Sequence, residues 1–226
     1  MKPTCHFIFI LTFSFIFITS VFSQSCSECR FISPVFDSVT VSTVKFGEGK
    51  NVDGINQELY MDIYRPFGDT MTNRPVAIFA FGGAFVQGAR NDWYVVEVCK
   101  LLAKAGYVAV SPDYRYGIDY SEIVQLRYMR IFFRAVQDMR ACIQYLKADY
   151  SELGNNYSID TNKIILGGAS AGAISALMTS YCDKESEMLQ TGSPTALDAL
   201  GGFNSTTGLY PNYGWGHAAV LSIAGA

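Results

Sequence analysis

The chain has 226 residues, a length typical of a single domain. Half of its residues are hydrophobic, 14% are aromatic and only 16% are charged, which argues against a disordered tail, a coiled coil or a collagen-like rod. The 17 basic and 20 acidic residues give a formal net charge of −3, and no cluster of lysine and arginine is present. A nucleic-acid partner is therefore not expected.

The first residues have the pattern of a secretory signal peptide. Lysine at the second position precedes an almost unbroken apolar run over residues 7–18, and small residues follow near position 23. The run is shorter than the roughly 20 apolar residues of a membrane span, although residues 19–22 extend it and leave an uncleaved anchor as the alternative. We expect residues 1–23 to be removed and the product to be secreted or periplasmic, with no stable membrane span after cleavage.

Residues 24–37 form a short segment that contains Cys26 and Cys29. The mature chain would hold five cysteines, an odd number that cannot all pair within one chain. The Cys26–Cys29 spacing fits a local disulfide, a redox pair or half of a metal site. No strand–helix pattern supports a redox motif, and no second Cys/His pair supports zinc. A local disulfide or free thiols is the favoured interpretation, and an unpaired cysteine also fits a protein of which a part is missing.

The next elements alternate apolar and polar residues. Residues 38–46 and 58–64 have the pattern of half-exposed strands, and residues 47–54 between them predict a hairpin loop. The pattern then changes to continuous apolar runs, as expected for strands that are buried on both faces of a parallel sheet. The predicted buried strands are residues 76–81, 107–111, 163–166 and 218–224.

Helical patterns separate these buried strands. The first predicted helix begins at Asn91 or Asp92 and ends at Gly106, a second covers residues 129–146, and a third runs from the Gly167-Gly168 turn to about Tyr181. In the first helix, the side chains expected to point inward are Val95, Val98, Leu101 and Leu102. Residues 183–215 are polar and predict irregular structure.

This order of elements predicts an α/β fold over residues 38–226. The sheet should be mostly parallel and doubly wound, with antiparallel strands at its N-terminal side and right-handed crossovers. Such sheets carry their functional groups on loops after the carboxyl ends of the strands. Because the sequence ends where such a loop should begin, we expect a fold that lacks its last strands.

The central chemical signal is Gly168-Ala169-Ser170-Ala171-Gly172, which fits G-x-S-x-G between a predicted strand and a predicted helix. A serine at such a sharp turn projects its hydroxyl from the sheet edge, and the residues two before and two after it must be tiny. The amide after the serine lies at the helix N-terminus, where it can bind an oxyanion. The alternative is a small-residue turn whose serine only caps the helix.

A glycine loop follows the first buried strand. Phe81-Gly82-Gly83-Ala84-Phe85 places consecutive glycines where uncovered backbone amides can approach a developing alkoxide. An ordinary glycine turn is the alternative, but the loop and the serine turn occur in the order that an oxyanion site requires.

These motifs resemble the α/β-hydrolase superfamily, in particular the carboxylesterase and lipase branch with an H-G-G-G or H-G-G-A loop, which includes feruloyl-esterase-like domains. The resemblance runs from about residue 38 to the end of the chain. It is specific to the superfamily and unspecific about the substrate. The matching segments are residues 60–66, 82–85, 106–115, 138–146 and 163–173.

The resemblance implies a carboxylesterase-type serine hydrolase that acts on a small-molecule ester. Ser170 would be the nucleophile, and the backbone amides of Gly82, Gly83 and Ala171 would form the oxyanion hole. The reaction would pass through an acyl-enzyme after a histidine accepts the serine proton. No metal and no organic cofactor is implied.

The sequence also departs from the family pattern. Phe81 replaces the histidine that opens the glycine loop and braces it. Of the two histidines, His6 lies in the predicted signal peptide, and His217 precedes the last predicted strand, at the end of the sheet opposite Ser170. Asp113 and Asp138 match structural positions of the family, so no triad acid is recognisable.

Two explanations fit these departures. The acid and base can lie beyond Ala226, which would make the 226 residues a fragment that is inactive by itself, or the chain is a short protein without efficient catalysis. An uncovered sheet edge at the last strand favours the fragment. A non-catalytic hydrolase-like binding module and a secreted serine peptidase or lipase are the alternative functions.

Overall fold

The computed structural model describes residues 29–190, 194–205 and 207–225. The predicted signal peptide, residues 1–23, and Cys26 lie outside the described residues. Cys29 is disulfide-bonded, whereas Cys99, Cys142 and Cys182 are free thiols. Within the described ranges, no helix combines the length and the hydrophobicity that crossing a membrane requires.

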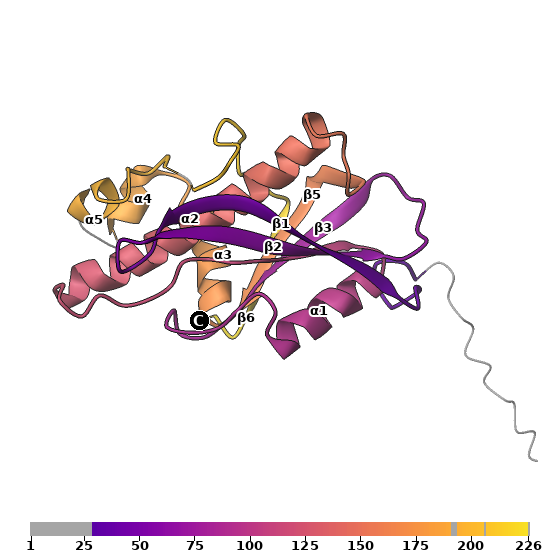
Figure 1. Ribbon diagram of the computed structural model, residues 1–226, viewed down its shortest axis with the longest axis horizontal. Helices are drawn as coiled ribbons and strands as arrows, with labels where there is room; N and C mark the ends of the chain where they lie inside the picture. The colour runs from indigo at the N-terminus through magenta and orange to yellow at the C-terminus, as the bar shows by residue number, and fades with distance from the viewer. Residues whose placement is uncertain (1–28, 191–193, 206, 226) are drawn as a thin grey trace, which may run out of the picture.

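A mixed sheet forms the centre of the molecule, and its six strands in the described part of the chain lie in the order β1-β2-β4-β3-β5-β6 (Figure 1). β1 pairs antiparallel with β2, and β2 pairs antiparallel with β4, whereas β4, β3, β5 and β6 run parallel. The predicted α/β fold, with its antiparallel start, is therefore confirmed. The strands are β1 (Val39–Lys50), β2 (Asn56–Pro66), β3 (Arg74–Ala80), β4 (Val108–Pro112), β5 (Ile159–Ala169) and β6 (Ala219–Ile223).

Helices cover the sheet on both faces. On β2, Met61 faces α2, where its Sδ lies 3.6 Å from Sγ of Cys142, whereas its neighbour Asp62 points to the opposite face and pairs with Arg90 just before α1. α1 packs on β4, β2 and β3, while α3 packs on β5 and β6 and beside α2. The helices are α1 (Trp93–Lys104), α2 (Val124–Ser151), α3 (Ala171–Tyr181), α4 (Glu185–Gln190) and α5 (Pro194–Asp198).

A second, smaller apolar cluster lies beside the amino-terminal half of α2, where α4 and α5 pack against it. Arg140 of α2 holds the chain both before α4 and after α5, because its guanidinium donates hydrogen bonds to the carbonyl oxygens of Cys182 (3.0 Å) and Phe203 (2.7 Å). The same group lies over the rings of Phe203 and Trp215. Arg140 is 1% exposed, and burial lowers its pKa to about 10.

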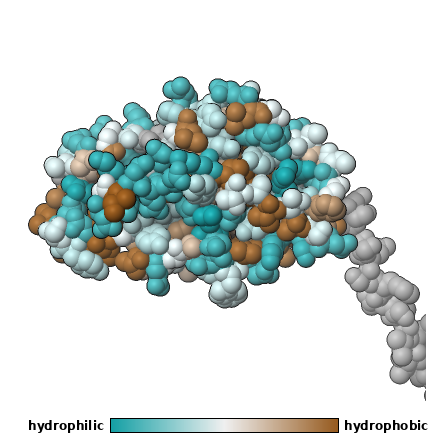
Figure 2. Space-filling view, in the orientation of Figure 1, coloured by the Kyte–Doolittle hydropathy of each residue, from teal (hydrophilic) through white to brown (hydrophobic). Residues whose placement is uncertain are grey.

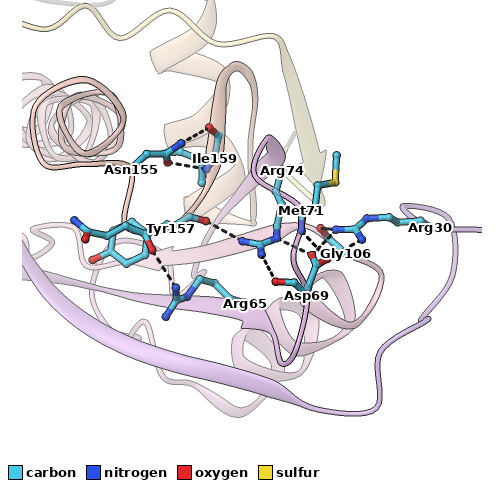
Figure 3. Close-up of polar contacts among 10 residues, drawn as sticks. Arg30, Arg65, Asp69, Met71, Arg74, Gly106, Asn155, Tyr157 and Ile159 are labelled. Carbon is cyan, nitrogen blue, oxygen red and sulfur yellow. Dashed lines mark hydrogen bonds and ion pairs between the residues drawn. The ribbon is translucent and has the colours of Figure 1, made fainter.

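At the amino ends of β3 and β5, a polar network joins segments that are far apart in the sequence (Figure 3). Asp69 accepts hydrogen bonds from both nitrogens of the Arg30 guanidinium fork (3.0 and 2.5 Å) and from Nε of Arg74 (2.7 Å). Arg74 also donates to the carbonyl oxygen of Tyr157 (3.0 Å), in the turn before β5. The network fixes the end of the sheet that lies away from Ser170.

The hairpin and β5 extend beyond their predicted bounds. β1 continues through a bulge between Lys45 and Gly47 and pairs with β2 as far as Lys50, so the hairpin loop is shorter than predicted. β5 begins at Ile159, and Gly167 and Gly168 belong to this strand rather than to the turn, since they pair with β3 on one side and β6 on the other. The expectation of irregular structure in residues 183–215 was wrong where α4 and α5 form.

Two predictions of burial were also wrong. Leu101 is 57% exposed, because Val95, Cys99 and Ala103 form the buried stripe of α1. β6 is an edge strand with mostly exposed residues, and Leu221 and Ile223 are 53% and 46% exposed. α3 covers one face of β6, while α1 lies over β2, β3 and β4 on the other face of the sheet and does not reach it.

Candidate functional site

Ser170 occupies a single-residue turn between the end of β5 and the start of α3. Its backbone angles are φ 50° and ψ −117°, a conformation that a residue other than glycine rarely adopts. The side chain is exposed. The local structure therefore presents the serine hydroxyl to solvent at the carboxyl end of the parallel strands.

Two glycines make this turn possible. A Cβ atom on Gly172 would lie 2.3 Å from the carbonyl oxygen of Ala80 and 2.4 Å from that of Phe81. A Cβ atom on Gly168 would lie 2.5 Å from the carbonyl carbon of Gly172. No side chain fits at either position, since the turn brings the backbones of β5, α3 and β3 into direct contact.

The backbone around Ser170 is held at both ends. Its amide donates a hydrogen bond of 2.9 Å to the carbonyl oxygen of Ile223 on β6, and its carbonyl oxygen accepts one of 3.0 Å from Ile174. Ala171 follows as the first residue of α3. The first amides of an α-helix have no carbonyl acceptor within the helix, and the amide of Ala171 is one of them. It is therefore suited to bind a negative charge.

The glycine loop after β3 lies directly beside the serine. A Cβ atom on Gly82 would lie 3.2 Å from Cβ of Ser170 and 3.0 Å from the carbonyl oxygen of Ala169. Gly83 has φ 129°, and a Cβ atom there would lie 2.0 Å from the carbonyl oxygen of Gln87. The fold thus brings together Gly82, Ser170 and Ala171, with Gly83 next along the loop.

Tyr94, on the first turn of α1, contacts this loop. Its hydroxyl accepts a hydrogen bond of 2.6 Å from the amide of Gly82. Tyr94 is not among the site residues predicted from the sequence. No spacing pattern in the sequence links it to Gly82, because the contact arises from where α1 crosses the end of β3.

Aromatic packing braces the loop where the family has a histidine. The ring of Phe81 stacks on Tyr114 with centroids 4.1 Å apart and an interplanar angle of 15°. The hydroxyl of Tyr114 donates a hydrogen bond of 2.9 Å to the carbonyl oxygen of Phe81. Tyr114 has no exposed surface, so this contact belongs to the core and fixes the start of the loop.

His217 is remote from Ser170. Its Nε2 lies 2.7 Å from Oγ of Ser180, near the last turn of α3, whereas Ser170 precedes the first turn. Ten residues of helix separate the two serines, about 15 Å along the helix axis. Since a general base must lie within hydrogen-bond reach of the hydroxyl, His217 cannot serve Ser170 in this arrangement.

The two aspartates assigned to structural positions are engaged elsewhere. Asp113 accepts hydrogen bonds from Arg90 (2.9 Å) and from the amide of Tyr60 (3.0 Å). Burial raises the pKa of Asp113, against the lowering effect of these partners. Asp138, fully buried, pairs with Arg115 at 2.9 Å. Both carboxylates tie loops to helices and strands, and neither pairs with His217, the histidine in the described part of the chain.

Comparison with known proteins places these motifs in a family. Residues 61–200 match the BD-FAE family. Over 158 residues the chain is 29% identical to esterase LipC from Mycobacterium tuberculosis, covering 69% of this chain but only 34% of that protein. The chain thus spans about a third of the length of this curated relative.

Solved esterases are also similar. The esterase Est2 from the planctomycete Thermogutta terrifontis is 27% identical, with a TM-score of 0.46, and the match covers 62% of this chain and 44% of that chain. A brefeldin A esterase, described as a bacterial homologue of human hormone-sensitive lipase, is 23% identical with a TM-score of 0.49 and coverage of 69% and 38%. With the family match over residues 61–200, the chain belongs to the BD-FAE family, within the α/β-hydrolase superfamily.

Proposed function

We propose that the chain is the serine-bearing part of a secreted hydrolase that cleaves carboxylic esters. One observation carries the proposal: Ser170 stands exposed on a positive-φ turn at the N-terminus of α3, and Gly82 lies so close that a Cβ atom added to it would be 3.2 Å from Cβ of Ser170. This combination of a strained, accessible hydroxyl and neighbouring amides is what acyl transfer requires. The esterases among its relatives support the same reaction class.

In the proposed reaction, Oγ of Ser170 attacks the ester carbonyl as its proton passes to a base. The carbonyl oxygen becomes an oxyanion, which accepts hydrogen bonds from the amides of Gly82, Gly83 and Ala171. The C–O bond to the alcohol breaks as the alcohol takes up a proton, and the acyl group stays on Oγ. Water then attacks the acyl-enzyme, releasing the carboxylic acid and restoring the serine hydroxyl.

The acid and base are proposed to come from residues beyond these 226. His217 lies with Ser180, and Asp113 and Asp138 pair with arginines. The match also covers no more than about half of any relative described above. Without acid and base, the oxyanion site and substrate binding would leave only about 10³–10⁴-fold acceleration over water. We therefore expect residues 1–226 alone to be nearly inert.

A non-catalytic binding module is the second candidate. It is favoured by the hydrogen bond between Gly82 and Tyr94, which engages one of the proposed oxyanion donors. In that case Ser170 would not react with any electrophile, and the exposed turn would only form part of a binding surface.

A fluorophosphonate probe separates the two candidates. The test uses the complete chain encoded by the reading frame that contains residues 1–226, followed by mapping of the labelled peptide. We expect labelling at Ser170 that the substitution Ser170→Ala abolishes. Ser180→Ala, which removes the partner of His217 on the same helix, should leave the labelling unchanged. Absence of labelling in the complete folded chain would contradict the hydrolase and support the binding module.

A further inference from the structure

An apolar cavity of about 760 Å³ lies between the amino-terminal half of α2 and the carboxyl-terminal half of α3. Its α2 wall includes Val124, Tyr128 and Phe132, which share one helix face at four-residue spacing, and its α3 wall is formed by Met178 and Cys182. No charged residue lines it within the described chain. The volume and the lining are those of a site for an apolar small molecule or chain.

The α3 wall continues toward the proposed nucleophile. Ser170, Ile174, Met178 and Cys182 follow one another at four-residue spacing, so they form one ridge along the helix surface. Eight residues of helix separate Ser170 from Met178, about 12 Å along the axis. The cavity therefore begins roughly 12 Å from the serine, measured along the axis of α3.

The α2 wall reaches the glycine loop. The ring of Phe132 packs edge-on against Phe85, with centroids 5.2 Å apart, and Phe85 is the last residue of the loop that carries Gly82 and Gly83. Both walls thus connect to the two segments that meet at Ser170. The outer end is open, since Val124 is 62% and Tyr128 is 48% exposed. Figure 2 shows hydrophobic surface at the end of the molecule where the start of α2 lies in Figure 1.

We propose that this cavity receives the acyl chain of the ester and that the favoured substrates carry an unbranched aliphatic chain of about ten carbons or more. The proposal rests on the proposed function, because the chain enters from an acyl group attached to Ser170. An extended chain advances about 1.2 Å per bond, as in an extended polypeptide, so about ten bonds span the distance from the serine to Met178. Short acyl groups would end before the apolar walls begin.

Cys182 reports on the occupancy of the cavity without any need for catalysis. Its thiol is half-buried and lines the cavity, and burial raises its pKa. The other free thiols of the described residues, Cys99 and Cys142, have no exposed surface, so among these three thiols Cys182 should be the one alkylated under native conditions. The rate of alkylation by iodoacetamide at mildly alkaline pH, read by peptide mass spectrometry, measures how far a bound chain shields this sulfur.

The test adds straight-chain carboxylates, the products of the proposed reaction, to the complete folded protein. Dodecanoate below its micellar concentration should slow the alkylation of Cys182 at least tenfold, and butyrate should not. The half-protecting concentration is the carboxylate concentration that halves the alkylation rate of Cys182. Each two-carbon extension of the carboxylate should lower this concentration about tenfold, because two more methylene groups are buried. Equal effects of butyrate and dodecanoate, or none from either, would overturn the proposal.

A matched pair of variants checks the location. Val124→Asp places a charge at the mouth of the cavity on a residue that is 62% exposed, and should raise the half-protecting concentration of dodecanoate at least tenfold. Leu101→Asp makes the same kind of change at a 57% exposed position of α1, on the other face of the sheet, and should not. Equal responses of the two variants would contradict a chain bound in this cavity.

The same samples, treated with the fluorophosphonate, distinguish the two proposals. Labelling of Ser170 without chain-dependent protection of Cys182 would overturn the acyl cavity and leave the hydrolase standing. Protection of Cys182 without labelling of Ser170 would support a site for aliphatic chains and contradict serine chemistry.

Discussion

The amide of Gly82 donates a hydrogen bond of 2.6 Å to the hydroxyl of Tyr94, beside the turn that carries Ser170. One donor of the proposed oxyanion hole is therefore engaged in the absence of substrate. An ester that uses this amide must first displace the phenol oxygen, and an exchange of this kind costs about 1 kcal/mol.

Tyr94→Phe removes that competing acceptor. In the complete protein we expect kcat/KM for a nitrophenyl ester to rise about threefold to tenfold, since the transition state no longer has to break the bond between Gly82 and Tyr94. Steady-state kinetics on the wild type and the variant measure the change. A tenfold fall would instead assign the hydroxyl a direct role as a donor to the oxyanion.

Gly172→Ala should destabilise the fold severely. The new methyl group would lie 2.3 Å from a carbonyl oxygen of β3, so the strand and α3 would have to separate. We expect a loss of about 3 kcal/mol or more in the free energy of unfolding, measured by urea denaturation. Gly214→Ala, where nothing lies within 4 Å of the added atom, is the control and should stay within about 0.5 kcal/mol of the wild type.

Asp69 should make stability depend on pH in the acid range. Burial by itself would raise its pKa, but hydrogen bonds from Arg30 and Arg74 outweigh that effect and lower the pKa to about 2. Because the ordinary value is 3.8, the carboxylate stabilises the fold fully above about pH 4, and this contribution disappears as the pH falls through 4 toward 2. The shift corresponds to about 2 kcal/mol.

Asp69→Asn tests this assignment through the pH profile of unfolding. The variant should lose about 2 kcal/mol relative to the wild type at pH 7, and the difference should shrink toward pH 2. Asp53, an exposed aspartate in the hairpin loop, provides the control Asp53→Asn, which should leave the profile unchanged. A deficit of Asp69→Asn that is the same at both pH values would refute the electrostatic origin.

Arg140→Met should loosen the attachment of Cys182, Phe203 and Trp215 to α2. The substitution leaves the carbonyl oxygens of Phe203 and Cys182 without their donor while keeping an apolar side chain of comparable length. We expect the free energy of unfolding to fall by about 1–3 kcal/mol, the cost of two partly buried acceptors that lose their donor. Arg65→Met, which removes one exposed hydrogen bond to the carbonyl of Asn156, should cost less than about 1 kcal/mol. Similar losses for both variants would contradict the role given to Arg140.

The sequence was sufficient for the fold and for the neighbourhood of Ser170, because small residues are required there by local geometry. The backbone around Gly168 and Gly172 leaves no room for a Cβ atom, so the turn requires glycine at these two positions and the sequence shows this requirement. The continuous apolar runs likewise indicated the parallel strands, which need hydrophobic side chains on both faces.

Tertiary contacts that leave no local pattern could not be predicted. The bond between Tyr94 and Gly82 depends on where α1 crosses the end of β3. The exposure of Leu101 depends on which face of α1 packs against the sheet. The exposure of β6 depends on α1, which packs on β2, β3 and β4. The hydrophobicity of a side chain does not show whether a neighbouring helix or strand covers it in the folded protein.

The hydrogen bond from the amide of Ser170 to the carbonyl oxygen of Ile223 connects the reactive turn, through the main chain alone, to β6, the edge strand of the sheet in the described part of the chain. Any strand or molecule that pairs with β6, or any substitution that displaces this strand, would therefore move the serine through a main-chain hydrogen bond, with no side chain between them. β6 thus helps to hold the proposed nucleophile in place, and a displacement of this strand would change the orientation of Ser170 directly.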